Sequence, residues 1–118
     1  MLRPTASVLI SNCGFPEQEH FAALRMMFRQ LFRASDRFDL AGMICCSGGP
    51  MLGNPALQGM LAWYTDAVRQ AGREVARDLR ISEATQATVD RPLIEDNKAY
   101  AEAANQSFAS YGVKPRRA

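Results

Sequence analysis

An uninterrupted apolar run near the start of the chain, ASVLISN at residues 6–12, is followed at once by the loop CGFPE at residues 13–17. A run that is apolar at consecutive positions is typical of a strand buried on both faces within a parallel sheet. Such a strand needs neighbours on both edges, and no earlier segment of the chain can supply them. We therefore expect an α/β fold that represents part of a larger sheet.

The next forty residues predict a βαβ unit. Residues 20–34 place apolar side chains on one helical stripe, namely Phe21, Leu24, Phe28 and Leu31. A second apolar run of strand length, LAGMICC, occupies residues 40–46. Two such runs separated by an amphipathic helix indicate parallel strands with a right-handed crossover between them.

Three helices are predicted after the second strand. Residues 56–79 show a helical repeat of apolar side chains interrupted only by Gly72, and Ser82 is suited to cap a short helix that ends at Val89. A last helix is expected to start near Asp96 and to be capped by Gly112. Its apolar face comprises Tyr100, Ala104, Phe108 and Tyr111. This pattern predicts a single partial domain over residues 1–112, followed by a flexible basic tail at 113–118.

Composition excludes several classes of function. A net charge of +2 is too small to indicate nucleic-acid binding, and no apolar stretch approaches the roughly 20 residues of a membrane span. We expect a cytoplasmic protein. The three cysteines, Cys13, Cys45 and Cys46, do not form a disulfide framework, because adjacent strand residues point to opposite faces. No cysteine or histidine spacing indicates a metal site, and no residue is assigned a catalytic role.

Both predicted strands end in loops rich in glycine and proline. The first comprises Asn12, Cys13, Gly14, Phe15, Pro16 and Glu17, and the second begins with Ser47, Gly48 and Gly49. Because the carboxyl ends of parallel strands share one edge of a sheet, both loops are expected where open α/β sheets bind ligands. The first loop could offer backbone N–H groups and an aromatic face to a planar ligand. Without further evidence, an ordinary connection is the favoured interpretation, because loops of this kind join many strands to helices.

Several segments resemble one family in the same order along the chain. VLISNCGFPE at residues 8–17 resembles the fourth-strand region of NAD(P)H-dependent FMN reductases and related flavodoxin-like oxidoreductases, including the iron-sulfur flavoproteins. AGREVA at 71–76, IS at 81–82, RPLI at 91–94 and residues 100–105 are similar to the C-terminal segments of that family. The resemblance covers nearly the whole chain.

The resemblance implies a partial flavodoxin-like sheet, FMN as cofactor and electron transfer from NAD(P)H. It places residues 12–17 beside the isoalloxazine ring and, less directly, residues 47–49. The chain departs from the family because it contains no Gly-Ser-rich turn to hold the FMN phosphate. The cysteine cluster of the iron-sulfur subgroup is also absent.

Two functions therefore stay open. The first is an oxidoreductase module that is incomplete without an N-terminal half or a partner chain. The second is a non-catalytic interaction or assembly protein derived from the C-terminal half of the fold. Both predict association, either between copies of this chain or with a chain that supplies the missing half of the sheet. Neither involves nucleic acid or a membrane.

Overall fold

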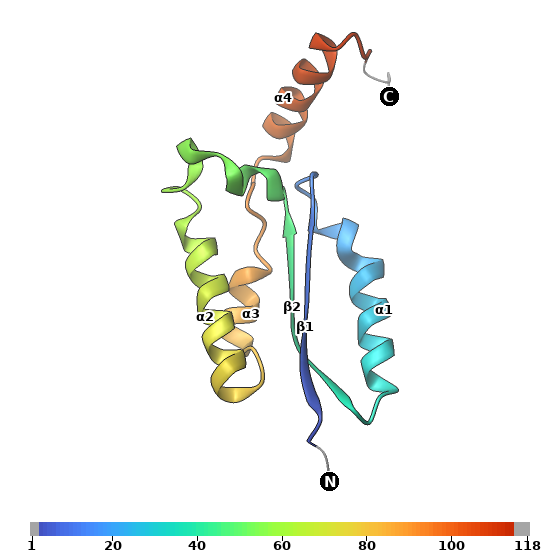
Figure 1. The fold of residues 1–118 in the computed structure, drawn as a ribbon. Helices are drawn as coiled ribbons and strands as arrows, with labels where there is room; N and C mark the ends of the chain where they lie inside the picture. Colours follow the sequence, from blue (N-terminus) through green and yellow to red (C-terminus); the bar gives the residue numbers. More distant parts are fainter. Residues whose placement is uncertain (1–2, 115–118) are drawn as a thin grey trace.

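The computed structural model describes residues 3–114 and contains a sheet of two parallel strands, β1 (Thr5–Cys13) and β2 (Phe38–Ser47) (Figure 1). The chain crosses between them through a short 3₁₀ helix, η1 (Gln18–Phe21), and helix α1 (Ala22–Arg33). The predicted α/β class and parallel βαβ unit are thus confirmed. Residues 115–118, which include most of the predicted basic tail, lie outside the described residues.

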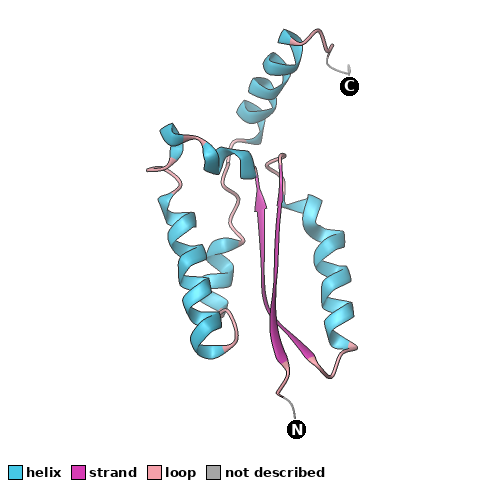
Figure 2. Ribbon diagram, viewed as in Figure 1, coloured by secondary structure: helices cyan, strands magenta, loops and turns pink. Residues whose placement is uncertain are grey.

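Helices cover both faces of the sheet, with α1 on one side and α2 (Ala62–Asp78) and α3 (Glu83–Val89) on the other (Figure 2). Alternate residues of β2 enter two separate cores. Met43 and Cys45 pack with Phe21 below α1, whereas Ile44 and Cys46 pack with residues of α2 and α3. The two adjacent cysteines therefore lie on opposite faces, as strand geometry requires.

The helix ends mostly follow the sequence signals. The Ser82 hydroxyl accepts a hydrogen bond from the Thr85 N–H at the start of α3, and the Asp96 carboxylate caps α4 (Asn97–Ser110) in the same way. The predicted helix from residue 56 was wrong at its start. Its first turn is a separate 3₁₀ helix, η3 (Pro55–Leu57), and a turn containing Gly59 delays α2 until Ala62. No helix within residues 3–114 has the length and apolarity needed to cross a membrane.

The two strands differ in burial. The last five residues of β2, from Met43 to Ser47, are buried, and so is Ala41, whereas none of the β1 residues is fully buried. Ile10 in β1 is 73% exposed. The expectation that the first strand is buried on both faces was therefore wrong, because the described helices pack mainly on β2 and leave β1 as an open edge strand.

The outer edge of β2 is covered by polar groups that take the place of a third strand. The Ala41 carbonyl accepts a hydrogen bond from the Ile81 N–H at 2.9 Å. The side-chain amide of Gln86 accepts from the Met43 N–H at 3.2 Å and donates to the Met43 carbonyl at 2.6 Å. Gln18 Nε2 donates to the Cys45 carbonyl at 3.2 Å. Four backbone groups along this edge, the Ala41 carbonyl, the Met43 N–H and carbonyl and the Cys45 carbonyl, are thereby bonded without a neighbouring strand.

Further polar contacts connect α1 on one face of the sheet with α3 on the other face. Arg25 in α1 donates to Gln18 Oε1 and forms an ion pair with Asp90, both at 3.3 Å. Asp90, at the end of α3, also accepts a hydrogen bond from Gln86 at 2.9 Å. The side chains that cover the β2 edge are therefore linked to one another, which restricts their rotamers. No described element covers β1 in this way within residues 3–114.

Helix α4 projects beyond the carboxyl end of the sheet (Figure 1). The radius of gyration is 17.2 Å, whereas a compact domain of this length has a value of about 13 Å. Phe108 is 53% and Tyr111 82% exposed, so the predicted apolar face of this helix is mostly on the surface instead of in a core. Gly112 does adopt the left-handed conformation expected of a helix C-terminal cap, with φ 78°.

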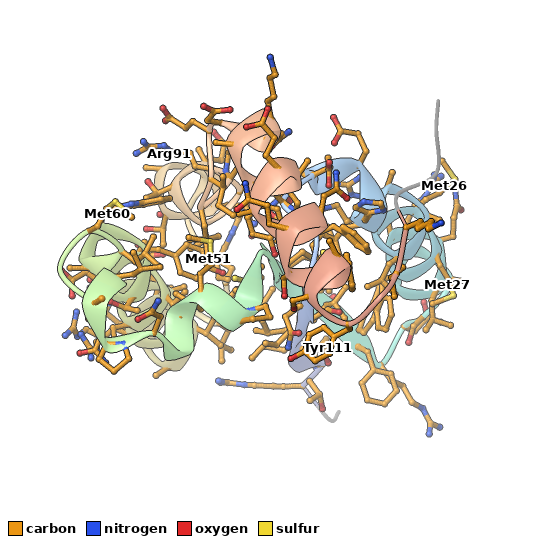
Figure 3. The ribbon with its side chains drawn as sticks, turned by 90° about the horizontal axis from the view of Figure 1, so that it is seen from above. Met26, Met27, Met51, Met60, Arg91 and Tyr111 are labelled. Atoms are coloured by element: carbon orange, nitrogen blue, oxygen red, sulfur yellow. The ribbon has the colours of Figure 1, made fainter. Side chains whose placement is uncertain are left out.

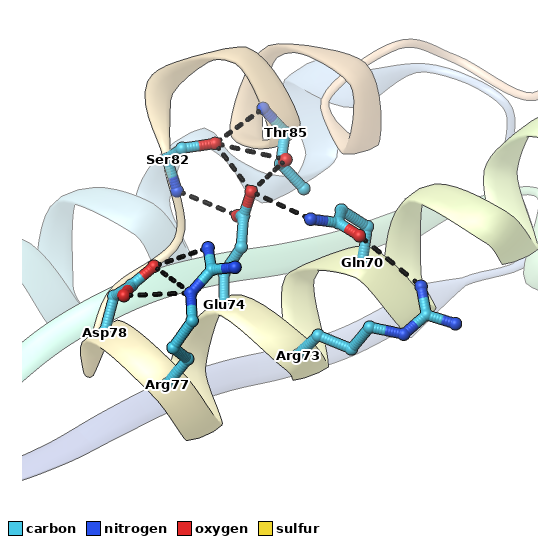
Figure 4. Close-up of polar contacts among 7 residues, drawn as sticks. All are labelled: Gln70, Arg73, Glu74, Arg77, Asp78, Ser82 and Thr85. Atoms are coloured by element: carbon cyan, nitrogen blue, oxygen red, sulfur yellow. Dashed lines mark hydrogen bonds and ion pairs between the residues drawn. The ribbon is translucent and has the colours of Figure 1, made fainter.

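The carboxylate of Glu74 ties α2 to the start of α3 (Figure 4). It accepts hydrogen bonds from the Ser82 N–H, the Ser82 hydroxyl and the Thr85 hydroxyl at 2.8–3.0 Å, and from Gln70 at 3.4 Å. The Glu74 residue is only 7% exposed. Hydrogen bonding to the charged form, above all by the Ser82 backbone, lowers the pKa of Glu74 to about 2.

We expect Glu74→Gln to destabilise the fold at pH 7 and to have a smaller effect as the pH falls. Since the pKa in the folded state is about 2 and the usual value is 4.5, the stabilisation is fully present above pH 4.5 and is lost toward pH 2. Urea unfolding of both proteins between pH 7 and pH 2 tests this. Glu83→Gln, at an exposed position in α3, is the control. A difference between Glu74→Gln and the parent that is independent of pH would contradict this role of the carboxylate.

Candidate functional site

The structure brings the two strand-end loops together at the carboxyl edge of the sheet. The Gly48 N–H donates a hydrogen bond to the Phe15 carbonyl at 2.9 Å, and the Cys13 thiol donates to the same carbonyl at 3.2 Å. A side chain at Gly49 would approach Asn12 Cβ to 3.0 Å. Close contact between the loops therefore depends on a residue without a side chain at Gly49.

Gly48 also has a conformational reason to be glycine. Its φ is 68°, which is the left-handed region that most other residues avoid, and an added Cβ would lie 3.1 Å from Ile94 Cδ1. Ile94 belongs to the segment between α3 and α4, so this segment packs on the second loop. Tyr100 in the first turn of α4 donates its hydroxyl hydrogen to the Gly14 carbonyl at 2.5 Å. The base of α4 is thus attached to both loops.

The first loop presents an aromatic surface. Phe15 is 59% exposed, and its ring centroid lies 5.5 Å from that of His20 at an interplanar angle of 40°. Gly14 has no heavy atom within 4 Å of the position that a Cβ would occupy, whereas Pro16 is buried and anchors the loop. The Cβ side of Gly14 and the exposed face of Phe15 are therefore open to a planar ligand, whereas the Gly14 carbonyl is occupied by the Tyr100 hydroxyl.

A cavity of about 450 Å³ lies beside these loops, between β1 and α2. This volume falls within the range of small-molecule sites. Its walls are mainly apolar and come from the two strands, the loop after β2 and helix α2: Ile10, Ser11, Asn12, Ile44, Cys46, Gly49, Pro50, Leu52, Tyr64 and Val68. Of the nine residues predicted for the site, Asn12 and Gly49 line this cavity. The other seven predicted residues do not line the cavity; they lie in the loops at its margin or on the opposite face of the sheet.

Tyr64 contributes an unpartnered polar group to the cavity wall. The residue is 3% exposed, and its hydroxyl makes no hydrogen bond within residues 3–114. Burial raises the pKa of Tyr64 well above its usual value, and burial also raises the pKa of the neighbouring Cys46 thiol. Both groups are therefore neutral near pH 7. An uncharged hydroxyl in an apolar wall can donate one hydrogen bond to a ligand.

Ser47 does not face the ligand-accessible surface. It is 1% exposed, and its hydroxyl accepts a hydrogen bond from Gln18 Nε2 at 2.9 Å. Ser47 thus helps to hold Gln18 against the edge of β2. The polar role of Gln18 was not predicted, because a glutamine after a strand-end loop carries no distinctive pattern. The helical spacing of Leu61, Tyr64 and Val68 does indicate the inward face of α2, but it cannot show that the Tyr64 hydroxyl lacks a partner.

The charges around the first loop are mainly negative. Glu17 follows Pro16, Glu19 lies in the next turn, and His20 Nε2 approaches Glu17 Oε2 at 3.4 Å. Carboxylates at this position repel a phosphate and weaken the attraction of the helix N-terminus for anions. The acidic residues of this loop therefore do not fit the phosphate of a flavin, whereas the exposed face of Phe15 could contact a planar ring.

Comparison of the chain with protein-family models, curated proteins and solved structures finds no match in any of the three.

Proposed function

We propose that this chain forms the ring-binding part of a flavodoxin-like oxidoreductase module that transfers electrons from NAD(P)H through FMN. The observation that carries the proposal is the hydrogen bond from the Gly48 N–H to the Phe15 carbonyl. It joins the two strand-end loops beside the cavity of about 450 Å³. The resemblance of residues 8–17 to the ring-contact region of FMN reductases supports the same assignment.

Each part of the first loop has a distinct task in this proposal. The exposed face of Phe15 stacks against the isoalloxazine ring, and Gly14 leaves room for the ring to approach the backbone. The side-chain amide of Asn12, in the cavity wall, can donate to and accept from polar atoms of the ring. A bound flavin supplies hydride and single-electron transfer, whereas the chain binds and orients it. A second polypeptide holds the phosphate.

We expect Gly14→Val to weaken FMN binding at least tenfold, which corresponds to about 1.4 kcal/mol. The branched side chain would occupy the space through which the ring approaches the backbone. Gly14 does not have a positive φ and has open space around it, so the fold should tolerate valine. Quenching of flavin fluorescence measures the affinity, and circular dichroism checks the fold.

Gly59→Val provides the matched control, because Gly59 also has no atoms within 4 Å of an added Cβ and lies outside both loops. Its FMN affinity should equal that of the parent. If Gly14→Val binds FMN as tightly as the parent does, the first loop is not the ring site.

The open edge of β1 favours the second candidate function, a non-catalytic assembly protein. Ile10 is 73% exposed on this strand, and no described strand pairs with its outer edge. FMN uptake distinguishes the two candidates. Purified protein that binds FMN and accelerates NAD(P)H oxidation supports the oxidoreductase, whereas colourless protein that takes up no FMN supports the assembly protein.

A further inference from the structure

We infer that the open edge of β1 pairs in the antiparallel direction with β1 of a second copy of this chain. The pairing joins two sheets into one with the strand order β2-β1-β1-β2. This inference goes beyond the proposed function and does not depend on flavin binding. It identifies the interaction surface, the partner and the alignment of the two strands.

The first observation is the difference between the two sheet edges. Ile81, Gln86 and Gln18 bond to backbone groups of Ala41, Met43 and Cys45 on the outer edge of β2, so these residues stand where another strand would have to pair. No such cover exists on β1 among residues 3–114. Edge strands of monomeric proteins are usually protected by charged residues or proline. Residues 5–13, TASVLISNC, contain neither.

The second observation is that β1 is complementary to itself. In an antiparallel pair centred on Leu9, Ser7 faces Ser11 of the other copy and Val8 faces Ile10 of the other copy. Apolar residues thus oppose apolar residues, and hydroxyls oppose hydroxyls, which favours pairing. In this register Arg3 of each copy lies opposite residue 15 of the other copy, beyond the end of the paired strand.

The third observation concerns space and symmetry. Pairing by a twofold axis perpendicular to the sheet keeps the same face of both copies on the same side. The two β2 strands would be about 14 Å apart, which is three strand spacings. Helices packed on these strands would clear one another, because packed helix axes are about 8–10 Å apart. The β1 pair would then form the floor of a groove between the two α2 helices.

The pairing would also complete the cavity beside β1. Ile10, Ser11 and Asn12 line one side of this cavity, and Ile10 is largely exposed in a single copy. In the paired form, Val8 of the second copy packs against Ile10 and extends the apolar wall. The cavity of about 450 Å³ would therefore be enclosed by residues of two copies.

Sedimentation velocity and Ile10→Lys test the inference. The parent protein should be a dimer at about 50 μM, and Ile10→Lys should raise the dissociation constant at least ~100-fold by placing a charge against Val8 of the second copy. Because Ile10 is 73% exposed in one copy, lysine at this position should not prevent folding. Circular dichroism of the variant verifies that it is folded.

Two variants with similarly exposed apolar side chains serve as controls. Met26, 65% exposed on the outer side of α1, and Phe108, 53% exposed on α4, are each replaced by lysine (Figure 3 labels Met26). Both variants should remain dimeric. If the parent protein sediments as a monomer, the inference is wrong, and the β1 edge is then free to pair with a different polypeptide. The inference is also wrong if Ile10→Lys remains dimeric while Met26→Lys or Phe108→Lys becomes monomeric.

Discussion

Gln86→Leu is expected to lower the free energy of unfolding by about 2–4 kcal/mol, because a buried donor and a buried acceptor on β2 would both lose their partner. The Gln86 amide bonds the N–H and the carbonyl of Met43, which is 7% exposed. Leucine has a similar size and a high helix propensity, so α3 itself should persist. Urea unfolding followed by circular dichroism measures the loss.

The control for this variant is Gln30→Leu, at an exposed position on α1. Surface substitutions of this kind usually change stability by less than about 0.5 kcal/mol. If Gln86→Leu were as stable as Gln30→Leu, the glutamine amide would not be the group that satisfies the edge of β2. Water would then have to perform that role.

Gly42→Ala is expected to cost about 1–3 kcal/mol through overpacking beneath α3. Ser7 pairs with Leu40 and Val8 pairs with Gly42, so Ala41 is an extra residue in β2 that has no partner in β1. Gly42 is the residue directly after this irregularity. An added Cβ would lie 2.4 Å from Ile81 Cδ1, 2.8 Å from Ile81 Cγ1 and 3.0 Å from Gln86 Oε1. The methyl group would therefore displace both residues that cover this part of the strand edge.

Thermal unfolding of Gly42→Ala and of Gly59→Ala separates this packing effect from the general effect of replacing a glycine. Gly59 has no neighbour within 4 Å of an added Cβ, so alanine there should be neutral or slightly stabilising. Equal unfolding midpoints for the two variants would show that Ile81 and Gln86 can move aside without cost. That result would contradict tight packing between α3 and β2.

The fold of this chain was largely predictable because its signals are local. Continuous apolar runs marked both strands, and helical spacing and capping residues such as Ser82 and Asp96 marked the helices. The cover of the β2 edge was not predictable, because Gln86 contacts Met43 across 43 positions of sequence. The apolar pattern of α4 likewise indicates a face to be buried but does not specify what covers it.

The candidate site was predictable only in part, for a similar reason. Parallel strand ends share an edge, so the meeting of the two loops followed from topology. Side-chain direction within a loop does not follow from topology, and Ser47 turns inward to Gln18 whereas Phe15 turns outward. The cavity depends on how α2 is positioned relative to β1, which is a property of tertiary packing. Its unpartnered Tyr64 hydroxyl was therefore visible only in the structure.

Parallel fluorescence titrations of riboflavin and FMN with the purified chain test ring binding most directly. If residues 12–17 contact the ring and nothing in this chain holds the phosphate, both flavins should be quenched with dissociation constants that agree within about threefold. Absence of quenching by the folded protein at about 100 μM would contradict ring binding. FMN affinity exceeding that of riboflavin by ~100-fold would instead contradict the assignment of the phosphate to a second polypeptide.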